Sequence, residues 1–330
     1  MNKTVSKNST LILILPILIV LGSCKKDSKK VYSELFEPGK ISTTAVEYSP
    51  SFSANGTELY FAKSNDPWGK GKLKSSIYFS VKKNNQWSIP EQLPFSGTYD
   101  DSDPHLTNRG KTLYFISKRP SKDSPLISAD IWKVEKDETD QWGTPIRLSS
   151  TINSEKNEYS PRTDGEGNLY FASDREGGYG QGDLYVAKKV KDSFSIPQNL
   201  GNTINTAKGE WNLEVSQKGD LIIFEASQRA QNRSSFGDLY ISFKLNNKWT
   251  TAQNIEEINT TGSDLYPQLV HNNRRLYFTS SNVLKSTDTN IYSIEFKTLL
   301  NQYRKNARDQ NKKPSKRRVC FLSFTSRSKI

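Results

Sequence analysis

The sequence contains little of what most metal, redox and hydrolytic sites are built from. Its 330 residues include only two cysteines and two histidines, so a three-histidine metal site and a thiolate cluster are both excluded. The Gly-x-Ser-x-Gly, His-Glu-x-x-His, Cys-x-x-Cys and P-loop motifs are also missing. The sequence therefore predicts no metal and no cofactor.

Excess positive charge is missing from the central part of the chain. The net charge of the whole chain is +12, but residues 1–30 contribute +5 and residues 304–330 contribute +9, which leaves −2 for residues 31–303. A body of that charge has no broad cationic surface for phosphates, so we expect no nucleic-acid partner.

Aromatic and turn-forming residues are plentiful. The 15 Tyr, 15 Phe and 6 Trp residues are too many for a solvated chain, and Gly, Asn, Ser and Thr are spread along the whole sequence. This composition is typical of an all-β protein that is long enough to bury a large core.

The N-terminus resembles the signal peptide of a bacterial lipoprotein. Lys3 and Lys7 precede an apolar run of eleven residues, 11–21, which is shorter than the roughly 20 residues that cross a bilayer. The run ends in Leu21-Gly22-Ser23-Cys24, which resembles a lipobox. We therefore expect a signal peptide at 1–23, a lipid on Cys24 and a flexible tether over 24–31. The alternative is an ordinary secreted protein whose cysteine is incidental.

Lys25, the residue after the cysteine, indicates the membrane in which the lipid anchor would sit. Lys25 is not the Asp that typically retains lipoproteins at the inner membrane, so we expect a lipid anchor in the outer membrane, facing the periplasm or the cell exterior. The lipid would be the only attachment to the membrane. At the other end, residues 301–330 are rich in cations and lack periodicity, which predicts a disordered basic tail.

A unit of nearly constant length is repeated along the chain. Its marker is an acidic residue followed three positions later by Pro, with a degenerate copy in which Leu213 replaces Pro. The acids are separated by 54, 57, 52 and 54 residues. The five markers begin at Glu47, Asp101, Glu158, Glu210 and Asp264. Such a period indicates units that are stacked or arranged in a ring.

Each unit has the strand pattern of a propeller blade. A short strand, a Gly- or Asn-containing turn and a buried Leu-Tyr-Phe strand are followed by a third strand and by a fourth that starts at an aromatic residue, as in Trp87 to Pro90. The fifth unit stops after its third strand, and residues 35–44 resemble the missing segment. We predict an all-β fold: a five-bladed β-propeller of four-stranded antiparallel blades over 32–300, closed by an N-terminal strand.

The motifs Glu-Tyr-Ser-Pro (158–161), Leu-Tyr-Phe-Ala-Ser-Asp-Arg-x-Gly-Gly (169–178) and Asp-Leu-Tyr-Val (183–186) resemble those of the WD40-like, TolB-type β-propeller repeat family. The resemblance covers roughly residues 35–297. It implies a propeller in the cell envelope but no single function, because the family includes envelope scaffolds, peptidase-associated propellers and some polysaccharide lyases.

The repeated acids have two interpretations. Glu47, Asp101, Glu158, Glu210 and Asp264 could supply the paired carboxylates of a glycosidase. However, a catalytic acid and base need different environments, whereas these five occupy equivalent positions. We therefore favour a structural role, in hydrogen bonds between blades.

The residue after each Pro differs from unit to unit. If the first strand is innermost, these residues line the central channel and form a candidate binding site. They are Ser51, His105, Arg162, Glu214 and Gln268. The alternative is a set of solvated channel residues that pair their charges.

We therefore predict a monomeric, non-catalytic envelope lipoprotein whose propeller binds envelope proteins or a cell-wall or surface glycan. The alternative is a carbohydrate-active propeller enzyme, a glycoside hydrolase or lyase, that uses carboxylates of the channel face. The enzyme requires two carboxylates that are unique to their blades and converge in one place. The scaffold requires only an exposed binding face.

Overall fold

A computed structural model describes residues 33–66, 74–107, 109–122, 127–234, 236–281 and 289–312. The expected signal peptide, Cys24, the tether and Cys320 lie outside these residues. The described residues, from Ser33 onwards, belong to one compact unit. None of the described helices has the length and apolar character needed to cross a membrane.

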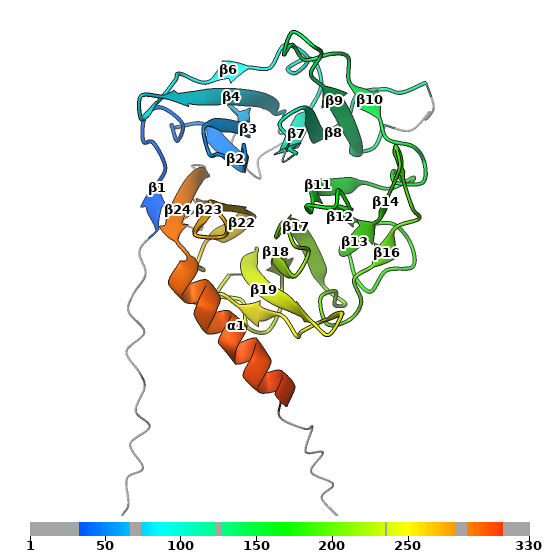
Figure 1. Ribbon diagram of the computed structural model, residues 1–330, viewed down its shortest axis with the longest axis vertical. Helices are drawn as coiled ribbons and strands as arrows, with labels where there is room; N and C mark the ends of the chain where they lie inside the picture. The colour runs from blue at the N-terminus through cyan, green and yellow to red at the C-terminus, as the bar shows by residue number, and fades with distance from the viewer. Residues whose placement is uncertain are drawn as a thin grey trace, which may run out of the picture. The chain divides into compact units, whose positions relative to one another are not determined.

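The compact unit is a ring of five antiparallel blades, which confirms the predicted fold (Figure 1). The innermost strands are β2 (Val46–Phe52), β7 (Asp101–Leu106), β11 (Glu158–Thr163), β17 (Gly209–Val215) and β22 (Ser263–Val270). The second strands are β3 (Glu58–Ser64), β8 (Thr112–Ser117), β12 (Leu169–Ser173), β18 (Leu221–Ser227) and β23 (Arg275–Ser281). The third strands are β4 (Ser76–Lys83), β9 (Asp130–Glu135), β13 (Asp183–Ala187), β19 (Asp238–Leu245) and β24 (Asn290–Glu295).

The outer strands differ from the prediction. The third strands pair with β6 (Glu91–Gln92), β10 (Ile146–Arg147), β16 (Gln198–Asn199) and β21 (Gln253–Asn254), which follow the aromatic segments. The aromatic residues instead belong to short hairpins that extend the third strands. These are β5 (Gln86–Trp87), β14 (Lys189–Val190) with β15 (Ser193–Phe194), and β20 (Lys248–Trp249). The fourth strand predicted from Trp87 to Pro90 is confirmed only at its start: Trp87 pairs with β4 in β5, and the chain pairs with β4 again in β6, after Pro90.

The predicted closure of the ring is confirmed. Strand β1 (Glu34–Leu35) pairs antiparallel with β24, so that Glu34 faces Ser293 and Leu35 faces Tyr292. Phe36 follows and packs edge-on against Phe52 and Tyr277, with ring centroids 5.7 and 5.1 Å away. The N-terminal strand thus completes blade 5, and its next residue packs into the joint with blade 1.

A helix replaces the first part of the expected disordered tail. Helix α1 (Lys297–Lys312) buries Leu299, Leu300, Tyr303 and Ala307, which lie on one side at helical spacing. They pack against the core of blades 4 and 5, and the Tyr303 hydroxyl donates to the Asn254 carbonyl at 3.0 Å. The prediction of disorder is therefore wrong for residues 301–312, and the rest of the tail lies outside the described residues.

Candidate functional site

Each innermost strand is interrupted by a bulge at the repeated motif. The register shifts between Tyr48 and Ser51 in β2, and at the equivalent place in the other four blades. The residue before Pro lies in the left-handed region in four of the five blades. These residues are Ser49 (φ 51°), Asp103 (φ 51°), Ser160 (φ 49°) and Tyr266 (φ 48°). This conformation is uncommon for residues other than glycine and marks the inner strands as strained.

The residues after Pro join neighbouring blades. The backbone N–H of Leu106 donates to Ser51 Oγ at 2.9 Å, that of Thr163 to His105 Nε2 at 3.0 Å, and that of Phe52 to Gln268 Oε1 at 2.9 Å. Each bond connects one blade to the next. The five candidate residues, Ser51, His105, Arg162, Glu214 and Gln268, are all buried, with at most 7% of their surface exposed. The structure therefore brings them together in the blade joints and does not leave them solvated.

Arg162 is the cation among these five candidate residues. It is completely buried, its Nη1 donates to the Pro161 carbonyl at 2.8 Å, and its Nε lies 3.4 Å from Glu214 Oε2 in the next blade. Burial and the charge of Arg162 hold the pKa of His105 well below its usual range. His105 is therefore neutral, and because its Nε2 accepts a hydrogen bond, its proton is on Nδ1.

Two further carboxyl groups belong to the same region. Asp103, at the bulge of β7, accepts a hydrogen bond from the Ser160 N–H at 2.9 Å; burial raises its pKa to about 6. Glu225, on β18, accepts a hydrogen bond from the Asn212 amide. Burial, reinforced by the charge of Asp103, raises the pKa of Glu225 to about 8.

Burial also raises the pKa of Glu214 to about 8, although the charge of Arg162 opposes the shift. We call Asp103, His105, Arg162, Glu214 and Glu225 the axial cluster. It contains three carboxyl groups that have no acidic counterpart at the same position of any other blade. Of the three, Glu225 keeps its proton at neutral pH, whereas Glu214 forms an ion pair with Arg162.

Several buried polar atoms in and beside the axial cluster have no hydrogen-bond partner in the structure. They are Ser49 Oγ, Asp103 Oδ1, His105 Nδ1 and Arg162 Nη2. Buried polar atoms are rarely left unpaired, so this region has donors and an acceptor available for a further polar group. In the part of the chain that the structure describes, no three His, Cys, Asp or Glu side chains are placed to hold a metal ion.

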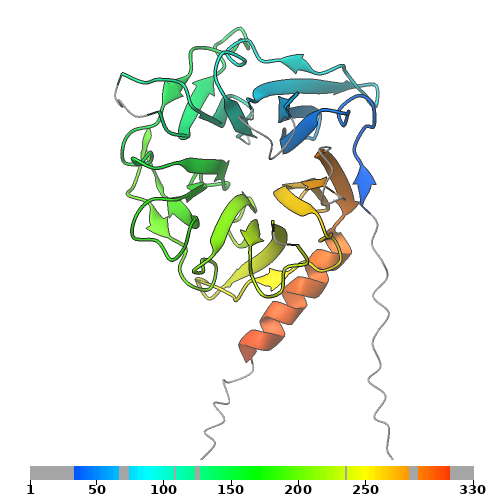
Figure 2. The ribbon, with the colours of Figure 1, turned by 180° about the vertical axis from the view of Figure 1, so that it is seen from behind.

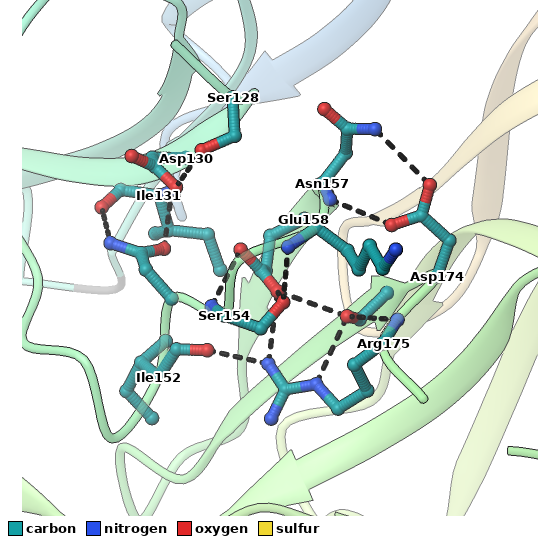
Figure 3. A network of polar contacts seen from close by, with 12 residues as sticks. Ser128, Asp130, Ile131, Ile152, Ser154, Asn157, Glu158, Asp174 and Arg175 are labelled. Atoms are coloured by element: carbon teal, nitrogen blue, oxygen red, sulfur yellow. Dashed lines mark hydrogen bonds and ion pairs between the residues drawn. The ribbon is translucent and has the colours of Figure 1, made fainter. Parts of the chain in front are cut away.

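The repeated acids do not belong to the axial cluster. Figure 3 shows the contacts in blade 3, where Glu158 accepts hydrogen bonds from the Ser154 hydroxyl at 2.6 Å and the Ser173 hydroxyl at 2.9 Å. Arg175 Nη2 lies 3.0 Å from the same carboxylate and also donates to the Ile152 carbonyl at 2.5 Å. Each acid thus fixes the segment that enters its own blade, so the predicted hydrogen bonds between blades are not what these acids make.

Equivalent contacts recur around the ring. A cation of the same blade pairs with the acid in three further blades: Lys63 with Glu47, Arg119 with Asp101, and Arg229 with Glu210. In blade 5, the hydroxyls of Ser280 and Thr260 donate to Asp264. The equivalence of these contacts explains why the acid recurs in every repeat.

The axial carboxyls should make the stability of the protein depend on pH. Glu225 has a pKa near 8 in the folded protein and near 4.5 when solvated. Between these values the folded state holds protons that the unfolded state has lost. The free energy of unfolding should therefore fall as pH rises from 5 to 8, by about 1 kcal/mol per pH unit for Glu225.

Urea unfolding at half-unit pH intervals measures this slope. Glu225→Gln should reduce the slope of unfolding free energy against pH by about 1 kcal/mol per pH unit. Glu295→Gln, at an exposed site on β24, should leave the slope unchanged. An equal slope in all three proteins would show that Glu225 is ionised at neutral pH.

Comparisons with known proteins bear on the fold. No protein-family model matches the chain, and no curated protein matches it. Among solved structures, it is similar to a glycoside hydrolase with a TM-score of 0.54 and 9% identity, over 81% of this chain and 91% of that one. A β-xylosidase/α-arabinofuranosidase from a compost microbial metagenome gives a TM-score of 0.49 and 11% identity, over 80% of this chain and 95% of that one.

A puromycin-hydrolyzing peptidase of Mycobacterium tuberculosis is also similar, with a TM-score of 0.40 and 12% identity over 71% of this chain. This chain spans 34% of that peptidase's length. At these identities the likeness extends to the propeller fold alone. The resemblance of the repeats to the TolB type stays a prediction.

Proposed function

We propose that the protein is a carbohydrate-active enzyme that hydrolyses glycosidic bonds at the axial cluster. The observation that carries the proposal is a group of three blade-unique carboxyls: Asp103 and Glu214 interact with the buried Arg162, and Glu225 interacts with Asp103. The likeness to solved structures supports the fold and not this chemistry.

The chemistry requires two carboxyls with different proton affinities. One carboxylic acid gives its proton to the departing sugar oxygen, and one carboxylate takes a proton from the attacking water. Glu225, with a pKa of about 8, suits the acid, and Asp103, with a pKa of about 6, suits the base. Glu214 pairs with Arg162 and is a positioning residue.

A panel of cell-wall and surface polysaccharides tests the proposal, with new reducing ends as the readout. We expect cleavage of at least one glycan between pH 6 and 8, and its loss in Asp103→Asn and in Glu225→Gln. Glu295→Gln should retain it, because Glu295 is exposed on β24. Cleavage that survives both axial substitutions, or no cleavage on any glycan, would reject the proposal.

A non-catalytic binding scaffold is the second candidate. The observation in its favour is burial: Asp103 is 2% exposed and Glu214 and Glu225 are each 7% exposed. Ser51, His105 and Gln268 are also occupied by bonds between blades. A stoichiometric partner recovered from crosslinked envelopes, equally with wild type and Asp103→Asn and without glycan cleavage, would support the scaffold.

We further propose that the protein is an outer-membrane lipoprotein anchored through Cys24. The lipobox-like sequence and the basic, apolar leader support this location. Incorporation of labelled palmitate should be complete in wild type and absent in Cys24→Ala. Equal labelling of both proteins would reject the anchor.

A further inference from the structure

Helix α1 has a cationic side as well as a buried one. Successive residues of an α-helix are rotated by about 100°. On that geometry all five Lys and Arg residues of α1 fall within about 100° of its circumference, outside the side that packs on the propeller. We call this the cationic stripe, and its residues are Lys297, Arg304, Lys305, Arg308 and Lys312.

Most of the stripe makes no ion pair within the described residues. Arg304 is half-buried, stacks over the Phe243 ring at 5.2 Å and lies 3.4 Å from Asp220. The other four cations are exposed, and within the described residues none of them has an acidic partner. Four unpaired cations on one side of a rigidly packed helix form a surface suited to an anionic partner.

The stripe also lies on the edge of the ring where the chain begins. Figure 2 shows β1 and the start of α1 on the same edge of the propeller. Strand β1 pairs with β24, and α1 begins two residues after β24 ends. Cys24 is nine residues before Ser33, and a chain of nine residues spans at most about 30 Å. A lipid on Cys24 would therefore hold this edge near a membrane surface.

We propose that the cationic stripe of α1 binds the anionic phospholipid headgroups of the membrane in which the lipid anchor sits. The inference rests on the proposed lipoprotein location, and it adds a protein surface that fixes the orientation of the ring. Clustered Lys and Arg residues beside a lipid anchor bind anionic headgroups, and salt screens the attraction. The propeller would lie with the edge formed by blades 4 and 5 towards the membrane.

Vesicle co-sedimentation tests the stripe without the lipid. The chain is produced from residue 24, without the proposed signal peptide. It is mixed with vesicles of phosphatidylcholine alone or with 30% phosphatidylglycerol at low salt. The stripe variant carries Lys305→Gln, Arg308→Gln and Lys312→Gln. The matched control carries the same loss of charge at exposed lysines of outer hairpins, Lys83→Gln, Lys191→Gln and Lys248→Gln.

We expect wild type and the matched control to bind the anionic vesicles alike and the stripe variant at least tenfold more weakly. Binding to pure phosphatidylcholine should be weak for all three. Equal weakening in the stripe variant and the control would overturn the proposal, because net charge alone would explain it. So would binding of the stripe variant at the wild-type level, or a preference for soluble wall polymer over anionic vesicles. Because the assay uses no lipidated protein and no glycan substrate, its result is separate from the palmitate and cleavage tests.

Discussion

Replacing Arg162 by Ala should lower the free energy of unfolding by about 3–5 kcal/mol. The substitution empties the space of a completely buried side chain, removes the hydrogen bond to the Pro161 carbonyl and leaves Glu214 without its cation. Losing one partner of a buried ion pair has a cost of this size. Urea unfolding followed by tryptophan fluorescence measures the loss.

Two comparisons isolate the ion pair from the lost volume. Arg162→Met fills most of the space, and combined with Glu214→Gln it should recover at least 1 kcal/mol relative to Arg162→Met alone. Arg274→Ala, at an exposed arginine, should change the free energy of unfolding by less than about 0.5 kcal/mol. A loss below 1 kcal/mol for Arg162→Ala would mean that the blade 3–4 joint does not depend on this pair.

Replacing Glu158 by Ala should have a similar effect, about 3–4 kcal/mol. Its carboxylate is fully buried and accepts hydrogen bonds from the Ser154 N–H and hydroxyl, the Ser173 hydroxyl and Arg175. The substitution leaves these donors without an acceptor, and each buried unsatisfied group costs about 1–3 kcal/mol.

The matched control is Glu176→Ala in the same blade. Glu176 lies 3.8 Å from Lys156 with 90% of its side chain exposed, and exposed pairs contribute little. Thermal unfolding should therefore separate the two variants by more than 5 °C. Equal melting temperatures would show that the repeated acid is not needed to hold the linking segment.

The repeats revealed the ring because local patterns carry that information. The acid, the Pro and the Leu-Tyr-Phe strand recur at a fixed spacing, and the missing strand of the fifth unit is identified by its likeness to the others. The sequence holds a further local signal: Ile152-Asn153-Ser154 recurs, with Thr in place of Ser, at 204–206 and at 258–260. Asn153 binds both the N–H and the carbonyl of Ile131, and its counterparts do the same to the third strands.

The axial cluster could be predicted only in part. His105, Arg162 and Glu214 were identified as blade-unique residues, but their burial depends on contacts with the next blade, which local sequence does not specify. The sequence does contain a pattern that marks Glu225. The residue after the repeated Phe is acidic only in blade 4, and in the other blades it is Ala62, Ile116, Ala172 or Thr279. Helix α1 is not predicted from the sequence because its segment is rich in charged residues, which favours a disordered tail. Its only helical signal is the spacing of four apolar residues, Leu299, Leu300, Tyr303 and Ala307.

The pairing of β1 with β24 has a consequence for how the chain folds. Glu34 and Leu35 are synthesised first among the propeller strands, and their partners Ser293 and Tyr292 last. The ring therefore cannot close until nearly all of the propeller has been made, and contacts between such distant residues form slowly. Until then the outer edge of β24 in blade 5 lacks its partner strand and is open to proteases and to other chains.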